Sequence, residues 1–311
     1  MSDKITWPDG KDFAFTVFDD TDRATVENVS KVYEFLNDRG FLTTKSVWPG
    51  QAMEKGGSRG STCEDEDYVS WLKVLQEYGF EIGYHSATFH ESERSQVKYA
   101  LERFYQLFGH YPRSMAQHTY REGESLYWGN DRLSGLNALA YKLLTRNRSK
   151  GLSRGHIEGD TYFWGDLCKE KVKYMRDFTY PDINTLKVSP MMPYHDPKRP
   201  YVNYWFQSSE GANVSSFNKC ISEENQDLLE AEGGACIMYT HFAFGFYENG
   251  SINARFDYLM QRLSRKNGWF VPVSDLLDYL LQSTDDHMLT DSTRNRLGRK
   301  WLFHKIRAGQ T

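Results

Sequence analysis

Short apolar runs alternate with longer amphipathic segments along most of the chain. Residues 13–18 form a β-rich apolar run, and residues 25–39 then carry apolar side chains at helical spacing as far as Gly40. The alternation continues with predicted strands at 41–48, 80–84 and 114–117 and predicted helices at 64–78 and 93–108. Repeated strand–helix units predict a parallel sheet with helices outside it.

The same alternation returns near the carboxyl end. A helix is predicted from Ser222, followed by strands at 235–240 and 269–271 and helices at 253–266 and 274–281. The region from 121 to 218 is rich in Trp, Tyr and Pro, and its pattern assigns no elements. Because no linker, repeat or low-complexity tract interrupts the chain, we expect one α/β domain whose parallel sheet closes into a barrel.

The composition narrows the class of protein. The chain has 311 residues, 15% of them aromatic, which is the length of one α/β barrel and too much apolar surface for a disordered chain. Its net charge of −4 offers no positive field, so we expect no nucleic-acid partner. There is no apolar run of about eighteen residues and no secretory pattern at the start, and the four cysteines lie far apart. We therefore expect a cytoplasmic protein with reduced thiols.

Chemically active side chains follow several of the predicted strands. Asp19 and Asp20 end the first strand, and His85, His118 and His241 each end a later one. In parallel α/β folds these ends meet on one face, where catalytic groups gather. Two imidazoles and a carboxylate form the open ligand set of a catalytic divalent ion, most often zinc, and a further histidine can protonate a leaving nitrogen.

Four segments resemble motifs of the polysaccharide deacetylases, the NodB-homology family. The segment 16–20 (TVFDD) resembles the first motif, TFDD, and the segment 85–90 (HSATFH) resembles the second, a pair of histidines. The segment 237–242 (IMYTHF) resembles the last strand-end histidine, and 268–280 resembles the closing strand and helix. The order and spacing of these segments extend over residues 10 to 281.

The resemblance implies a distorted (β/α) barrel of the NodB-homology type and metal-dependent removal of an acyl group from an amide nitrogen, usually on an N-acetylated sugar. It matches Asp19 to the general base and Asp20 to the metal-binding carboxylate. It also matches His85 and His90 to the metal imidazoles and His241 to the general acid.

The chain departs from the family pattern at two places. The family spaces its two histidines four residues apart, whereas His85 and His90 are five apart, so His118 is an alternative third ligand. The family's third motif, an Arg-Pro strand end, is replaced here by 117–122 (QHTYRE), in which Arg121 is the candidate to orient Asp19.

Aromatic side chains gather in the region without assigned elements. Tyr127, Trp128 and Trp205 are candidates to stack on a sugar, and His195 is a candidate to bind it. Two interpretations stay open, because Trp and Tyr also dominate buried contacts and His195 lies between prolines in a turn-like segment.

We expect a catalytic barrel over residues 1–283 and a basic carboxyl-terminal tail over 284–311. Residues 293–311 contain six lysines and arginines and no acidic residue, with apolar residues between them. The tail is either solvated or a helix packed on the barrel, or else a basic amphipathic segment that contacts an anionic membrane surface or a phosphorylated ligand.

These observations predict a metal-dependent deacetylase of an N-acetylated sugar, with a nucleotide- or lipid-linked precursor of a cell-surface glycan as substrate. Two other interpretations remain, namely a hydrolase of another small amide (a formamide or a ureide) and a catalytically silent barrel that binds glycans. The sequence leaves the oligomeric state and the identity of the sugar open.

Overall fold

Strand β1 (Phe13–Asp19) closes a parallel barrel in this computed structural model. The structure describes residues 5–51, 59–118, 123–146, 153–283 and 287–308. One edge of β1 pairs with β7 (Ala235–Thr240), from Ala14 opposite Ala235 to Asp19 opposite Thr240. Its other edge pairs with β10 (Gly268–Trp269) near the start of the strand and with β2 (Thr44–Val47) near its end. The first predicted strand is therefore the seam between the two ends of the chain.

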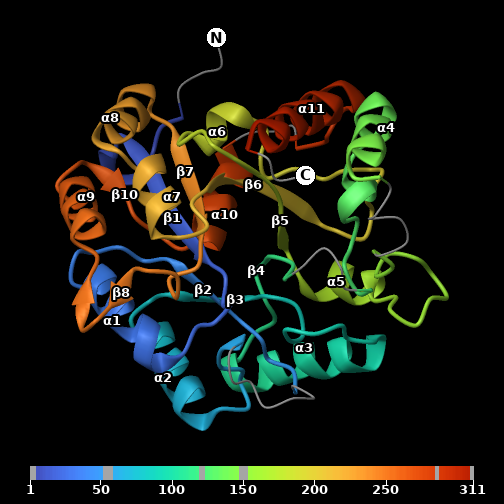
Figure 1. Ribbon diagram of the computed structural model, residues 1–311, viewed down its shortest axis with the longest axis horizontal. Helices are drawn as coiled ribbons and strands as arrows, with labels where there is room; N and C mark the ends of the chain where they lie inside the picture. Colours follow the sequence, from blue (N-terminus) through green and yellow to red (C-terminus); the bar gives the residue numbers. More distant parts are fainter. Residues whose placement is uncertain (1–4, 52–58, 119–122, 147–152, 284–286, 309–311) are drawn as a thin grey trace.

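The remaining barrel strands follow in chain order around the closed sheet (Figure 1). Every neighbouring pair is parallel, and the seven-stranded closure confirms the predicted α/β barrel. A short antiparallel hairpin, β8 (Tyr247–Glu248) with β9 (Ser251–Ile252), lies outside this sheet. The strands between β2 and β7 are β3 (Glu81–Tyr84), β4 (Ser114–Met115), β5 (Tyr174–Tyr180) and β6 (Tyr204–Glu210).

Six of the helices were predicted from the apolar pattern, and their bounds agree with it to within a few residues. The caps explain two of the starts: Thr25 forms a capping box with Asn28, and the side chain of Ser222 accepts a hydrogen bond from the N–H of Asn225. These helices are α1 (Val26–Asn37), α2 (Glu66–Glu77), α3 (Arg94–Phe108), α8 (Glu223–Glu232), α9 (Ala254–Ser264) and α10 (Val273–Ser283).

The region without predicted elements supplies two barrel strands, β5 and β6. Their sequences mix polar and aromatic residues because polar side chains such as Arg176, Asp177 and Gln207 are buried. This mixture conceals the apolar run that normally marks a parallel strand. The same region also forms four α-helices and a short 3₁₀ helix, namely α4 (Gly135–Leu144), α5 (Gly165–Lys171), α6 (Thr185–Val188), α7 (Val214–Cys220) and η3 (Gly129–Arg132). A second 3₁₀ helix, η1 (Pro8–Gly10), precedes β1.

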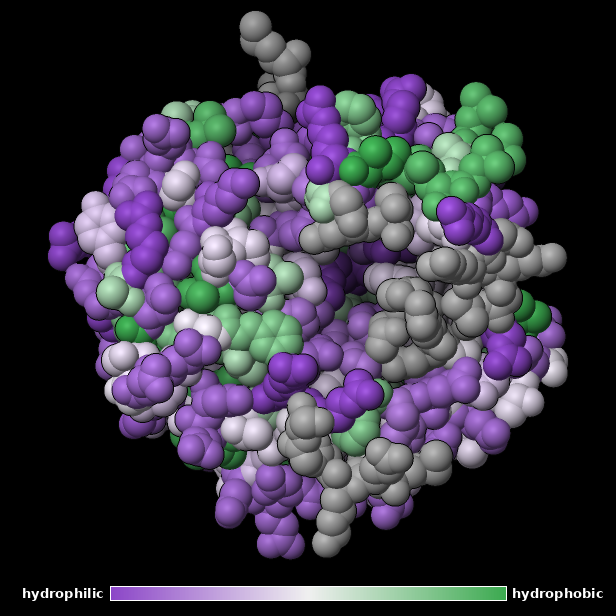
Figure 2. Space-filling view, in the orientation of Figure 1, coloured by the Kyte–Doolittle hydropathy of each residue, from purple (hydrophilic) through white to green (hydrophobic). Residues whose placement is uncertain are grey.

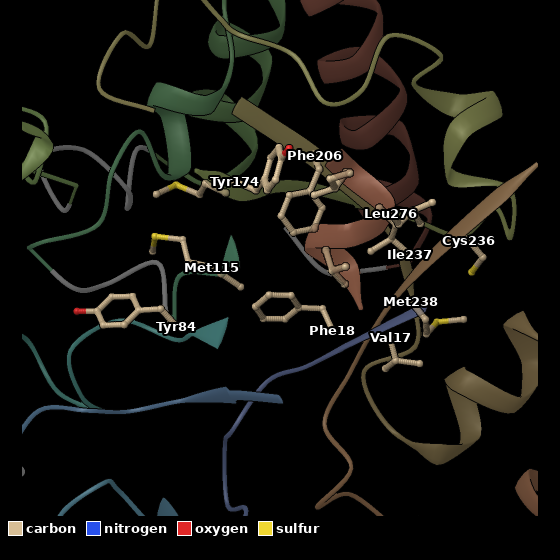
Figure 3. Close-up of a cluster of buried hydrophobic side chains, with 14 of the residues drawn as sticks. Val17, Phe18, Tyr84, Met115, Tyr174, Phe206, Cys236, Ile237, Met238 and Leu276 are labelled. Carbon is tan, nitrogen blue, oxygen red and sulfur yellow. The ribbon is translucent and has the colours of Figure 1, made fainter. Parts of the chain in front are cut away.

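Large side chains from several strands fill the barrel interior. Phe18 of β1 lies among Tyr84, Met115 and Phe206, and its ring centroid is 6.2 Å from that of Phe206 (Figure 3). Because successive residues of a strand point to opposite faces, Asp19 points the other way from Phe18. The residue that follows, Asp20, returns to the side of the barrel mouth.

The carboxyl-terminal segment is a helix, α11 (Asp291–Ala308), that packs on β5 and α4 (Figure 1). Trp301 is buried with its ring 5.1 Å from that of Phe178 and 5.7 Å from that of Tyr141. The basic segment is therefore a helix packed on the barrel and not a solvated tail. No helix in the described part of the chain is long and apolar enough to cross a membrane. The four cysteines are buried and free.

Candidate active site

The carboxylate of Asp22 lies among three histidines at the mouth of the barrel. The Nε2 atom of His118 is 2.9 Å from its Oδ1, and those of His85 and His241 are 3.1 and 3.4 Å from its Oδ2. These imidazoles come from the ends of β4, β3 and β7, so the closure of the barrel brings together residues 156 positions apart. The three strand-end histidines were predicted to converge, and they do.

A second carboxylate, Asp20, is buried beside this cluster and forms a two-pronged ion pair with Arg176. The guanidinium donates from Nη1 and Nη2 over 2.8 and 2.6 Å. The Nε2 atom of His85 lies 3.8 Å from Asp20, which links the ion pair to the histidines. Burial raises the pKa of Asp20, but Arg176 and His85 outweigh it, so the pKa falls below its usual value.

The third aspartate, Asp19, faces away from the pocket. Its Oδ2 lies 3.0 Å from Lys45 Nζ and accepts a hydrogen bond from the hydroxyl of Tyr33, and its Oδ1 accepts one from the N–H of Phe242. The alternation of side chains along β1 explains this separation from Asp20. Asp19 therefore connects β1 to its neighbours, and its predicted role as general base remains a prediction that its position does not favour.

Contacts at the mouth of the barrel shift the pKa values of Asp22 and His241. Burial raises the pKa of Asp22, but the hydrogen bonds from His118, His241 and His85 more than offset this and lower it far below its usual range. Burial lowers the pKa of His241, but its contact with Asp22 and the charge of Asp20 raise it overall. The Nδ1 atom of His241 is 2.8 Å from the carbonyl oxygen of Ala212, which leaves Nε2 to face the pocket.

The donor atoms of this cluster match those of a divalent metal site in kind. Asp22, His85 and His118 supply a carboxylate and two imidazole nitrogens, the set that binds zinc and similar ions. In the described part of the chain, however, no group of three or more His, Cys, Asp or Glu residues has an arrangement that could hold an ion. Instead, the Nε2 atoms lie against the carboxylate, and an ion held by these residues would replace those direct contacts.

Two residues of this cluster, Asp22 and Arg176, were not identified from the sequence. Asp22 follows Asp20 by two residues, a spacing that places two side chains on one side of an extended segment, and this signal was present. Arg176 lies in β5, within the region whose pattern assigned no strand, and nothing in its local sequence marks it.

Other predicted site residues lie elsewhere. His90 is outside the cluster, and its Nδ1 is 3.0 Å from the carbonyl oxygen of Glu91. His195 forms a β-bridge with Met288, and its Nδ1 is 3.0 Å from the carbonyl oxygen of Asn203. Arg121 falls outside the described residues. His118 therefore joins His85 at the cluster, and His90 does not.

A pocket of about 920 Å³ opens above the cluster, and Figure 2 shows the hollow near the centre of this face. Its volume is within the range of sites that enclose small molecules, roughly 300–1,000 Å³. The wall combines aromatic rings, cationic side chains and the carboxylates of Asp177 and Glu210. Four residues at the base of the pocket can take part in chemistry, namely Asp20, Asp22, His118 and His241. The residues on the wall include Trp128, Arg132, Tyr141, Arg146, Trp301 and Lys305.

Of the three aromatic candidates, Trp128 lines this pocket. The guanidinium of Arg132 lies 3.9 Å from the centroid of its ring, so part of the indole face is covered by a cation. Tyr127 packs against His156 with ring centroids 4.2 Å apart, and the guanidinium of Arg199 lies over the buried ring of Trp205. Tyr127 and Trp205 are therefore buried side chains that do not line the pocket.

The fold and the mouth cluster define the class: an α/β barrel with a carboxylate–histidine site at the carboxyl ends of its strands. The chain matches no protein-family model and no curated protein. Solved structures similar to it include a GH57-type branching enzyme from Pyrococcus horikoshii, at 10% identity and TM-score 0.50, covering 90% of this chain and 72% of that one.

The similar structures also include a Mycobacterium smegmatis protein assigned as a polysaccharide deacetylase, the family that the motifs resemble. It is 11% identical with TM-score 0.49, covering 92% of this chain and 96% of that one. An allantoinase is 12% identical with TM-score 0.47, covering 88% and 91%. At these identities the likeness concerns the fold alone.

Proposed function

We propose that the protein is a metal-dependent hydrolase that removes the N-acetyl group from a sugar. The observation that carries the proposal is the Asp22 carboxylate within 3.4 Å of three imidazole nitrogens at the base of a pocket. Asp22, His85 and His118 would hold a divalent ion, and zinc suits this donor set. Such an ion, when bound, polarises the acetamide carbonyl and activates water.

The neighbouring side chains supply the proton transfers. Asp20 takes the role of general base in place of Asp19, because it lines the pocket and Arg176 fixes the orientation of its carboxylate. His241 protonates the departing amine through Nε2, since its Nδ1 is engaged by the carbonyl oxygen of Ala212.

The pocket wall supports a glycan precursor as the substrate. Trp128 and Tyr141 offer rings on which the C–H faces of a sugar can stack. Arg146 lines the same wall and suits a phosphate, so a nucleotide- or lipid-linked sugar is the proposed substrate.

The experiment that tests the proposal compares two adjacent aspartates. The assay follows acetate release from N-acetylated sugar nucleotides and lipid-linked sugars after metal reconstitution. We expect Asp20→Asn to lower kcat by at least about 100-fold, the usual contribution of a general base, and Asp19→Asn to retain more activity. The reverse order would return the base to Asp19, and unchanged turnover in Asp20→Asn would exclude this mechanism.

Metal removal gives an independent test. We expect a chelator to abolish acetate release and zinc or another divalent ion to restore it, with one bound equivalent by elemental analysis. Turnover of formamides or ureides without acetate release would favour the other amide hydrolase. A protein that binds sugar but shows no turnover would favour a silent glycan-binding barrel. In that case Asp22→Asn should bind the sugar as well as the wild type does.

A further inference from the structure

Helix α4 carries a stripe of leucines that the protein leaves exposed. Leu136, Leu139 and Leu143 are 84%, 53% and 72% exposed, and no side chain of the helix is fully buried. Their spacing of three and four residues places them on one face. The opposite face packs on α11, where Asn137 donates to the carbonyl oxygen of Asn295 and Tyr141 contacts Trp301.

The outer face of α11 adds apolar and basic side chains to this stripe. Phe303 and Ile306 are about half exposed, and Arg299, Lys300 and Arg307 are exposed beside them. Figure 2 shows hydrophobic residues gathered over α4 and over the adjoining part of α11. We call this surface, made of Leu136, Leu139, Leu143, Phe303, Ile306 and the basic side chains next to them, the α4–α11 face.

The charge of this surface is opposite to that of the molecule. Residues 135–146 and 291–308 together contain eight lysines and arginines and one acidic residue, in a chain whose net charge is −4. Several of these cations are already paired inside the protein, such as Arg294 with Asp196 and Lys305 with Glu210. Lys142, Arg146, Arg299 and Arg307 extend the exposed positive surface.

The α4–α11 face is continuous with the pocket. Tyr141, Leu144 and Arg146 from the end of α4 and Trp301 and Lys305 from α11 all line the pocket wall. Leu144 is itself 46% exposed, so the apolar surface extends to the rim. A partner bound to the α4–α11 face would therefore lie next to the opening of the pocket.

We propose that the α4–α11 face docks on an anionic lipid bilayer. The leucines and Phe303 enter the boundary between headgroups and acyl chains, and the surrounding lysines and arginines contact lipid phosphates. Contiguous exposed apolar residues on a protein surface mark interaction sites. The proposal concerns where the protein works and does not depend on the reaction proposed above.

The charge pattern favours a bilayer over a second copy of the chain. A two-fold symmetric dimer through this face would bring the same patch of each copy together. Arginines and lysines with few acidic neighbours would then face one another, and this repulsion opposes the contact. Anionic headgroups supply the complementary charge over the whole surface.

The test is sedimentation of the purified protein with phosphatidylcholine vesicles, with and without phosphatidylglycerol. We expect binding to the anionic vesicles, weakened by salt. Binding by Leu139→Gln/Leu143→Gln should be at least about tenfold weaker, because two apolar side chains no longer leave water on docking. Leu228→Gln on α8, also an exposed leucine, is the matched control and should bind normally. Arg299→Gln/Arg307→Gln should lose the preference for anionic vesicles.

Each variant should fold, because all the substituted side chains are exposed. Circular dichroism and thermal unfolding check this. Absence of vesicle binding by the wild-type protein would overturn the proposal. Equal binding by the wild type and the α4 variant would do so too. A dimer in analytical ultracentrifugation that the α4 substitutions dissociate would assign the face to a second copy instead.

Discussion

Three aspartates within four residues occupy three different environments. Asp19 faces Tyr33 and Lys45, Asp20 pairs with Arg176, and Asp22 meets the histidines. One peptide unit is enough to move a carboxylate from one face of a strand to the other. Assignment of roles by motif alignment alone is therefore sensitive to a shift of one residue.

The Asp20–Arg176 pair gives a direct stability prediction. Arg176→Met should lower the free energy of unfolding by about 3–5 kcal/mol, because it leaves a buried carboxylate without its partner. Urea unfolding at neutral pH measures this. In the double variant Asp20→Asn/Arg176→Met the loss should be smaller, and a cost below about 1 kcal/mol for Arg176→Met alone would contradict the ion pair.

A buried carboxyl group outside the site predicts a pH dependence of stability. Glu81 accepts hydrogen bonds from Thr44, Ser114 and the N–H of Ser274, yet burial outweighs these contacts and raises its pKa above 4.5. The native state therefore binds more protons than the unfolded chain above pH 4.5, so this group lowers stability as the pH rises.

Urea unfolding of wild type and Glu81→Gln between about pH 4.5 and 8 checks this sign. The difference in unfolding free energy, wild type minus variant, should fall as the pH rises through the raised pKa. The comparison cancels groups that titrate equally in both proteins. A difference that grows with pH would show that the carboxylate form is the one stabilised by its three donors.

At the scale of elements, α11 illustrates how tertiary contacts select one use of an amphipathic segment. Trp301 and Leu302 are buried, whereas Phe303 beside them is 55% exposed. The same helix thus seals the barrel with one face and presents the other outward. Its amphipathicity was visible in the sequence, but the surface on which it packs was not.

Two neighbouring aromatic residues of α11 test this division. Trp301→Ala should destabilise the protein by about 3–5 kcal/mol, because it removes the ring between Phe178 and Tyr141. Phe303→Ala is the matched control and should change stability by about 0.5 kcal/mol or less. Chemical denaturation followed by fluorescence gives both values, and equal losses would mean that the helix packs through a different face.

At the scale of the whole molecule, the barrel closes through contacts between distant parts of the chain. Strand β1 pairs with β7 and β10, and α11 returns to β5 and α4. The side chain of Arg294 joins α11 to Asp196, which also binds Arg199. We therefore expect the segment after residue 283 to belong to the same folding unit as the barrel.

A chain truncated after Ser283 tests this unity. Leu297, Trp301 and Leu302 are buried, and the burial of each side chain contributes roughly 1.5–3 kcal/mol to the free energy of unfolding. Their sum is comparable with the total stability of a typical domain, about 5–15 kcal/mol. The truncated chain should therefore lose its cooperative thermal transition or unfold at a much lower temperature. An unchanged melting curve would support a separate barrel at 1–283.

The class of fold and most of the helices could be predicted from local sequence. Their apolar spacing and caps are local properties of contiguous residues, so α1, α2, α3 and β7 were predictable. The strand-end histidines were predictable too, because parallel strands end on one face. Three features depend on the folded barrel: the contact of Asp22 with these histidines, the pairing of Arg176 with Asp20, and the surface on which α11 packs. Those contacts join residues far apart in the chain, and their free energy exists only when the closed barrel brings them together.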